Sequence, residues 1–245
     1  MQLEVLRHTA DGAVHRVLLS GLPLGSRETA ELLDVIRRID GDDEARVVVL
    51  ESSGVDFCPG AAEELRPLDW TPDPAAALAG LRVPVVASLR GRVASVGFEI
   101  ALAADIRYAT PDLRCSLDDV AGGRLPCWGG TVRLPRAIGR PTATSVLLLG
   151  SELRDDDAIR SGLVVDVVGP DQLDATVTRA AEHLASLAPR ALELTKEAIG
   201  RGAELPMRSA LILEGDLNHL LQTTEDRSEG LRAFIDKRDA AFTGR

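Results

Sequence analysis

The sequence has little cysteine and no long apolar run. Its three cysteines, Cys58, Cys115 and Cys127, are too few, and odd in number, for a disulfide framework. Such a count is typical of a protein from a reducing compartment. No uninterrupted apolar run reaches the roughly 18 residues that a membrane helix needs, and the opening MQLEVLRHTADG lacks the apolar region of a signal peptide. We therefore expect a soluble, cytoplasmic protein that does not bind membranes.

Basic residues are not in excess, and no metal-binding pattern is present. The formal net charge of −10 argues against a general nucleic-acid-binding protein, although a few local Arg and Lys residues suffice to hold an anionic small molecule. The four histidines show no metal-ligand spacing, and no Gly-Lys-Ser/Thr follows the paired glycines as it does in a P-loop. We expect no metal centre and no nucleic-acid partner.

What the chain does have is the composition and patterning of a globular α/β protein. Hydrophobic residues make up 45% of the 245 residues and charged residues 27%, which is enough apolar material for one sizeable core. Strand-like and helix-like segments alternate, and then only helices follow. We therefore predict a core domain at residues 1–188 and a helical region at residues 189–245. Strands are predicted at residues 3–7, 14–20, 47–50, 83–89, 106–109 and 163–168, and helices from residue 26 to about 40, and at residues 95–104, 141–149, 151–161, 172–187, 189–201, 207–222 and from about 225 to 237.

The most informative stretch is residues 83–138. Residues 83–89 are apolar and largely β-branched behind a proline, which is typical of a buried strand. Ser95 is in the right place to cap the helix that follows. Glu99 lies one turn inside that helix among apolar neighbours, where a carboxylate is costly to bury unless it is paired or used.

A second acidic position follows about twenty residues later. Asp118 and Asp119 open an irregular, glycine-rich segment at residues 122–130. Two acids that reach one substrate from different elements suit acid–base chemistry. The alternative is that Glu99 forms a salt bridge and Asp119 shapes a turn. Because adjacent residues of an extended chain point in opposite directions, only one of the two aspartates can face the site.

Five segments, taken in order and with their separations, resemble the crotonase (enoyl-CoA hydratase/isomerase) superfamily nearly end to end. The segments are residues 57–61 (FCPGA), 91–105, 126–139, 162–164 (GLV) and 226–238 (DRSEGLRAFIDKR). The resemblance implies a spiral of stacked ββα turns followed by a helical C-terminal trimerisation region. It also implies acyl thioesters of coenzyme A, or of a carrier protein, as substrates, a homotrimer or homohexamer, and no cofactor apart from the coenzyme A of the substrate.

The same resemblance implies roles for individual residues. Ala61 and Val96 take the positions of two backbone N–H donors that form an oxyanion hole for the thioester oxygen, while Glu99 and Asp119 fall on the two catalytic acids of the hydratases. Phe234 and Lys237 fall on a tail segment that reaches a neighbouring subunit's coenzyme A in relatives, although a solvated helix face is an equal alternative. The full set expected to bind substrate is Gly60, Gly97, Cys127, Trp128, Phe234 and Lys237.

Three departures from the family pattern concern specificity. The second acid is usually glutamate, and Asp119 is one methylene shorter, which is about 1.5 Å of reach. Ser95-Val96-Gly97 replaces three glycines, and Cys127-Trp128 replaces a small pair, so that Trp128 either walls an acyl pocket or packs in the core.

We therefore expect a hydro-lyase that hydrates 2-enoyl thioesters or dehydrates 3-hydroxyacyl thioesters. Alternatives are an enoyl-CoA isomerase, a specialised dehydratase or decarboxylase, and an inactive oligomeric relative that only binds acyl thioesters.

Overall fold

The computed structural model describes residues 6–63, 65 and 73–245, and its centre is a six-stranded sheet with the order β1-β2-β3-β4-β6-β9. Strands β1 and β2 form an antiparallel hairpin, and each later strand pairs in parallel with its neighbour. The strands are β1 (Leu6–Asp11), β2 (Val14–Leu19), β3 (Val47–Ser52), β4 (Val85–Leu89), β6 (Ile106–Ala109) and β9 (Asp166–Val167).

Helices cover both faces of this sheet, and the alternation of side chains along β3 shows why. Val48 and Leu50 point into the core cluster that holds helices α1 (Ser26–Asp40), α2 (Pro74–Ala79) and α3 (Val96–Ala103). Val47 and Val49 point the opposite way, against α7 (Pro170–Ser186). A parallel sheet buried on both faces needs strands with continuous apolar runs, such as residues 47–50 of β3.

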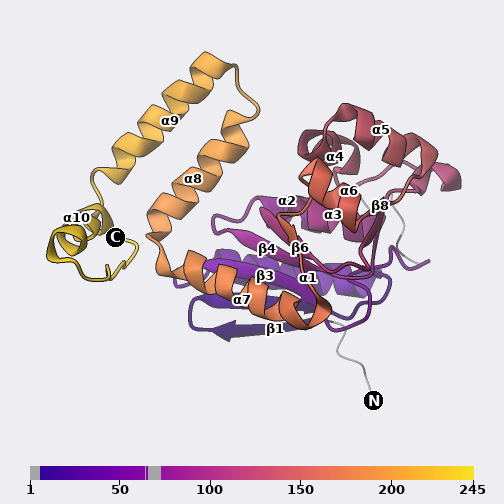
Figure 1. The fold of residues 1–245 in the computed structure, drawn as a ribbon, viewed down its shortest axis with the longest axis horizontal. Coiled ribbons are helices and arrows are strands. Elements are labelled where there is room, and N and C mark those ends of the chain that lie inside the picture. Colours follow the sequence, from indigo (N-terminus) through magenta and orange to yellow (C-terminus); the bar gives the residue numbers. More distant parts are fainter. Residues whose placement is uncertain (1–5, 64, 66–72) are drawn as a thin grey trace.

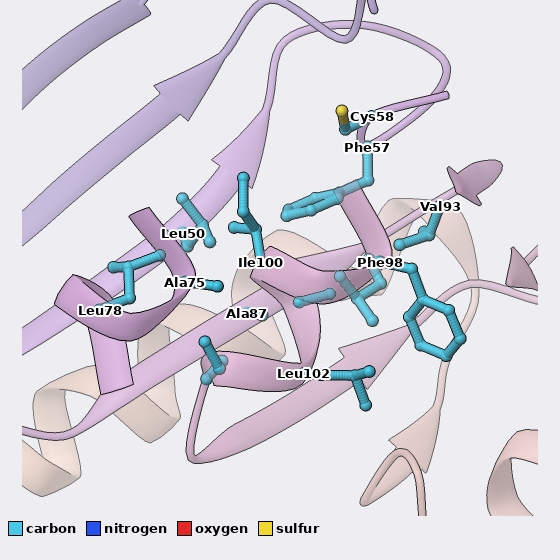
Figure 2. Packing of buried hydrophobic residues seen from close by; sticks show 14 of the residues in the cluster. Leu50, Phe57, Cys58, Ala75, Leu78, Ala87, Val93, Phe98, Ile100 and Leu102 are labelled. Atoms are coloured by element: carbon cyan, nitrogen blue, oxygen red, sulfur yellow. The ribbon is translucent and has the colours of Figure 1, made fainter. Parts of the chain in front are cut away.

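Helix α3 is the most deeply buried helix of the core. All eight of its residues are buried, so it is apolar around its whole circumference apart from Glu99. Figure 2 shows Ile100 of α3 beside Leu50 of β3, and Leu78 of α2 belongs to the same cluster. The rigid packing of α3 fixes the position of its one acidic side chain.

A second, three-stranded sheet and three helices lie beside this core. The sheet joins β5 (Arg92–Ala94), β7 (Arg114–Ser116) and β8 (Leu153–Arg154). A 3₁₀ turn, η1 (Asp119–Gly122), leads to α4 (Gly130–Ile138), α5 (Arg140–Leu149) and α6 (Asp155–Ser161). This sheet was not predicted from the sequence, because strands of two or three residues carry no readable alternation.

The last three helices are α8 (Pro189–Gly202), α9 (Met207–Leu221) and α10 (Glu225–Asp236). Helices α9 and α10 stand away from the sheets (Figure 1), whereas Lys196 of α8 donates to the carbonyl of Val83 at 2.9 Å and pairs with Asp105. They leave large apolar side chains uncovered within the chain. Met207 is 76% exposed, and Phe234 is 84% exposed. The structure has α8 begin at Pro189, and the division into two domains there stays a prediction.

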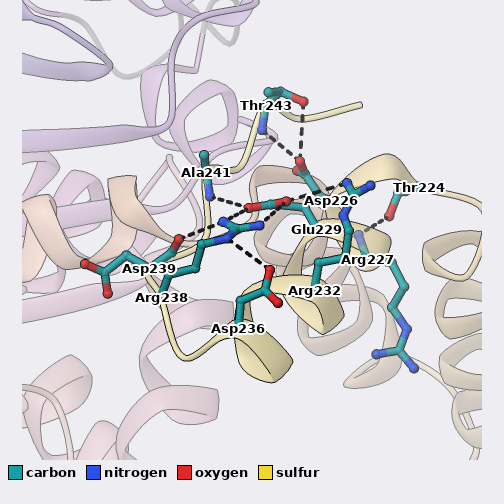
Figure 3. Close-up of polar contacts among 10 residues, drawn as sticks. All are labelled: Thr224, Asp226, Arg227, Glu229, Arg232, Asp236, Arg238, Asp239, Ala241 and Thr243. Carbon is teal, nitrogen blue, oxygen red and sulfur yellow. Dashed lines mark hydrogen bonds and ion pairs between the residues drawn. The ribbon is translucent and has the colours of Figure 1, made fainter.

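Two acidic residues of α10, Asp226 and Glu229, hold the C-terminal tail in place (Figure 3). Asp226 accepts hydrogen bonds from the N–H groups of Thr243 at 2.7 Å and Gly244 at 2.9 Å. Glu229 pairs with Arg238 at 2.6 Å. Residues 239–245 therefore return along α10 instead of leaving it.

Several predicted element boundaries differ from the structure. The first strand ends at Asp11 and not at residue 7, and residues 1–5 lie outside the described chain. The helix predicted at residues 151–161 starts only at Asp155, as α6, because residues 153–154 pair as β8 with β7. The strand predicted at residues 163–168 is only two residues long. Residues 66–74, whose three prolines predict a surface loop, fall mostly outside the described residues, and the last of them, Pro74, begins α2.

Over the residues that the structure describes, no helix has the length and apolar character needed to cross a membrane.

Candidate active site

Glu99 joins helix α3 to the start of α4 through its carboxylate. Its side chain is 1% exposed. Oε1 accepts hydrogen bonds from the backbone N–H groups of Trp128 and Gly130, both at 2.7 Å, and Oε2 accepts one from Cys127 at 3.3 Å. Oε2 is therefore the less occupied of the two oxygens.

Burial changes the protonation of Glu99. Removal from water, together with a smaller effect of the nearby Asp119 carboxylate, outweighs the three N–H donors, and the net result is that the pKa of its carboxyl group rises from 4.5 to about 7. A carboxyl group with a pKa near neutrality can both give and take a proton under physiological conditions.

Asp119 lies at the first position of η1 and points into the protein. The residue is buried, whereas its neighbour Asp118 is exposed. Its Oδ1 accepts a hydrogen bond from the hydroxyl of Ser95 at 3.0 Å and lies 3.8 Å from Nε of Arg124. Its Oδ2 is buried, and no group of the described chain bonds to it. One oxygen is thus held, and the other has no partner in the described chain.

The two acids share one environment. The charge of Asp119 influences Glu99, and both carboxylates act on the thiol of Cys127. Burial, followed by these two charges, raises the pKa of that thiol to about 12. Cys127 is therefore a neutral neighbour of the acids and not a nucleophile at physiological pH.

Two backbone N–H groups near these acids lack partners. Among the residues described, no group accepts a hydrogen bond from the N–H of Ala61 or Val96. Their loops pack together because Cys58 pairs with β5: the N–H of Ala94 donates to the carbonyl of Cys58 at 2.9 Å. The unpaired N–H of Val96, at the start of α3, can donate a hydrogen bond to a negatively charged oxygen, and the helix dipole also favours negative charge there.

Two glycines shape these loops. Gly60 has φ +138°, a conformation that side-chain-bearing residues rarely adopt. A Cβ on Gly97 would lie 2.5 Å from Cβ of Cys58, so only glycine permits the contact between the two loops. Gly97 therefore contributes by allowing close packing, and both glycines support the positions of the unpaired N–H groups.

The structure brings together most, but not all, of the residues singled out from the sequence. Trp128 is buried and belongs to the main core cluster, and its N–H and carbonyl bond to Glu99 and Arg133. Phe234 and Lys237 are exposed on and just after α10, which stands apart from α3 and α4 in this chain (Figure 1). Their predicted contact with substrate therefore requires a neighbouring copy.

Sequence reasoning missed two residues that contact Asp119. Ser95 does occupy the N-cap position of α3, but its side chain makes no capping hydrogen bond and contacts Asp119 instead. Arg124 follows within the glycine-rich segment. No local pattern identifies the contact of Ser95, because Ser95 and Asp119 are 24 positions apart.

Comparison with known families gives a match over nearly the whole chain. The model of the family described as enoyl-CoA hydratase/isomerase matches residues 24–245. The (E)-benzylidenesuccinyl-CoA hydratase of Thauera aromatica is 33% identical over 252 residues, covering 99% of this chain and 98% of the relative. The short-chain-enoyl-CoA hydratase of Clostridium acetobutylicum is 33% identical and covers 88% of this chain and 87% of the relative.

An isomerase and several solved structures are also similar. The 1,2-epoxyphenylacetyl-CoA isomerase of Escherichia coli is 32% identical, covering 88% of each chain. An enoyl-CoA hydratase structure from Bacillus anthracis superimposes with a TM-score of 0.91 at 28% identity, covering 99% of this chain and 100% of that one. A structure of enoyl-CoA hydratase subunit I from Geobacillus kaustophilus gives 0.90 at 29% identity and full coverage of both chains. The predicted fold class, an α/β core with a helical C-terminal region, is confirmed.

Proposed function

Because the chain belongs to the crotonase (enoyl-CoA hydratase/isomerase) superfamily, as its motifs predicted, we propose that it adds water reversibly to 2-enoyl thioesters of coenzyme A. One observation carries the proposal. Two buried carboxyl groups from different elements, Glu99 and Asp119, lie near enough for the charge of Asp119 to act on Glu99, and the two unpaired backbone N–H groups belong to α3 and to the loop packed against it. Acyl-CoA is the substrate type that the family implies.

The unpaired N–H groups of Ala61 and Val96 act on the thioester oxygen. During hydration, electrons move from the double bond to this oxygen, and an enolate forms. Fixed N–H donors aimed at that charge need no reorganisation in the transition state, and each contributes about 2.7–4 kcal/mol. Since the donors belong to the backbone, Val96 serves in this role despite its larger side chain.

The two acids perform the proton transfers. Near pH 7 the carboxyl group of Glu99 is about half protonated, because its pKa is raised to about 7, so both its acid and its base form are present for proton transfer. One carboxylate takes a proton from water while the hydroxyl oxygen bonds to the β carbon. The other carboxyl group delivers a proton to the α carbon, and the enolate returns to a thioester. The net change is the addition of one water molecule, and dehydration follows the same path in reverse.

Conservative variants of the acids test the proposal. Turnover of crotonyl-CoA is measured for Glu99→Gln and Asp119→Asn, with Asp118→Asn as the matched control, since that exposed carboxylate adjoins the site without facing it. We expect each of the first two changes to lower kcat about 10²- to 10⁴-fold, the typical contribution of a general acid or base. We expect the control to remain within about twofold of the wild type. Circular dichroism verifies that each variant folds.

Near-full turnover by Glu99→Gln would show that Glu99 has no catalytic role. If the chain instead binds acyl thioesters without catalysis, the wild type should turn over no enoyl-CoA. If acyl-CoA ligands also leave the melting temperature unchanged, not even binding is supported.

A second candidate function is isomerisation of an acyl thioester. A relative with 32% identity is a 1,2-epoxyphenylacetyl-CoA isomerase, and the short side chain of Asp119 reaches less far toward a water molecule than a glutamate does. An isomerase needs one proton carrier and must exclude water. Mass spectrometry separates the two reactions, because hydration adds the mass of one water molecule and isomerisation leaves the mass unchanged.

We also propose that the chain assembles as a homotrimer or homohexamer through its helical region, residues 189–245. The apolar side chains that α8, α9 and α10 leave exposed, such as Ile199 and Leu211, support this proposal. In such an assembly Phe234 and Lys237 reach the coenzyme A of a neighbouring copy. Light scattering after size-exclusion chromatography measures the assembly, and a monomer at micromolar concentration would contradict the proposal.

A further inference from the structure

Ser95 has an unusual backbone conformation and an unusual side-chain contact. It has φ 45° and ψ −124°, one of two positive-φ non-glycine residues of the described chain. Serine at a helix N-cap normally has an extended backbone and accepts a hydrogen bond from the helix with its side chain. Here the side chain makes no such bond and donates instead to Oδ1 of Asp119 at 3.0 Å.

The surrounding backbone holds Ser95 in this conformation. Its N–H donates to the carbonyl of Ser116 at 3.0 Å, and its own carbonyl accepts from the N–H groups of Phe98 at 2.9 Å and Glu99 at 3.1 Å. These bonds turn the chain from β5 into α3 and leave the N–H of Val96 without a partner. A glycine would satisfy the same backbone geometry without strain. Strain retained at such a position points to a use for the side chain.

We propose that Ser95 is a positioning residue that fixes the orientation of the Asp119 carboxylate, an inference that rests on the proposed function of Asp119. The hydroxyl of Ser95, together with the guanidinium of Arg124, occupies Oδ1. Oδ2 is left buried and without a partner in the described chain, available to the reacting water or to the substrate.

The shorter acid makes this anchoring useful. An aspartate has one fewer rotatable bond than a glutamate, and a hydroxyl contributed by the start of α3 holds its carboxylate close to the element that also carries Glu99. Catalytic groups misplaced by about 1 Å lose on the order of 10²-fold in rate, so a fixed orientation has a measurable effect. Arg124 is about half exposed and alone leaves the carboxylate less well defined.

Two variants test the proposal and distinguish the loss of the hydroxyl group from a change in the stability of the fold. Ser95→Ala removes the hydroxyl and keeps the strain, and Ser95→Gly removes the hydroxyl and relieves the strain. We expect both to lower kcat by about 10- to 100-fold, the effect of losing one hydrogen bond to a charged group, with KM within about twofold. We expect the glycine variant to melt at or above the wild-type temperature.

A double-mutant cycle provides the second readout. If Ser95 acts through Asp119, then Ser95→Gly lowers kcat no further in an Asp119→Asn background, because the group it positions no longer works. A further loss by the same factor as in the wild type would show that Ser95 acts independently of Asp119 and would overturn the proposal.

The outcomes also separate this inference from the proposed function. Wild-type kcat in Ser95→Gly, combined with a strong loss in Asp119→Asn, would overturn the role of Ser95 and leave the acid–base role of Asp119 intact. If Asp119→Asn kept the wild-type kcat, both the positioning role of Ser95 and the acid–base role of Asp119 would be wrong.

Discussion

The buried carboxyl group of Glu99 should make the stability of the protein depend on pH in a way that one substitution abolishes. The pKa of this group is raised from 4.5 in the unfolded chain to about 7 in the folded one, chiefly by burial. Between these values the folded chain keeps the proton of Glu99 while the unfolded chain releases it. Glu99→Gln removes the ionisable group and keeps its size.

The direction and size of the change in stability with pH follow from the difference in proton binding between the folded and unfolded chains. The stabilisation by protonated Glu99 is fully present below pH 4.5 and is lost as the pH rises through about 7. At about 1.4 kcal/mol per pH unit, this interval corresponds to about 3 kcal/mol. For a chain of this size, that is a difference of about 6–12 °C in melting temperature.

The measurement is thermal unfolding of the wild type and Glu99→Gln at pH values from 5 to 8, at one protein concentration so that association does not vary. We expect the wild type to lose stability relative to the variant across this range. Other carboxyl groups titrate in both proteins, so only the difference between the curves is informative. Glu214→Gln, at an exposed position on α9, is the control and should follow the wild type.

Parallel curves for the wild type and Glu99→Gln between pH 5 and 8 would refute the reasoning. They would show that the three N–H donors to Glu99 outweigh its burial.

Two further substitutions test the packing of the loops and the tail. Gly97→Ala places a methyl group 2.5 Å from Cβ of Cys58, and we expect it to lower the free energy of unfolding by about 1–3 kcal/mol and to lower kcat by displacing the N–H of Val96. Gly200→Ala is the control, because nothing lies within 4 Å of the added methyl group, and it should be neutral or stabilising. Equal melting temperatures for the two variants would contradict the contact between Gly97 and Cys58. Asp226→Ala leaves the N–H groups that hold the C-terminal tail without an acceptor, and limited proteolysis should then remove residues 239–245 quickly, whereas equal cleavage of the wild type would contradict the role of this acid.

The amino-acid sequence determined the long elements of the fold. Helix α1 begins at Ser26 as predicted, because its apolar residues recur at the helical period and form one buried face. Strand β3 was recognisable because four consecutive apolar residues are buried on both faces of the sheet. The order of the five motifs indicated the family, and the family match confirmed it.

The sequence also located the candidate acids without deciding between neighbours. It identified Glu99 by its apolar surroundings, whereas Asp118 and Asp119 were alternatives between which only the family resemblance chose, in favour of Asp119. The structure buries Asp119 and exposes Asp118.

Only the tertiary structure decided which side chains meet. Ser95 was predicted to cap α3, but its hydroxyl turns to Asp119, a partner 24 positions away on another element. The donors to Glu99 come from residues 127–130, and they depend on how α4 packs against α3. Local sequence fixes the period and propensity of an element, whereas these contacts depend on the chain path between elements, which no local pattern records.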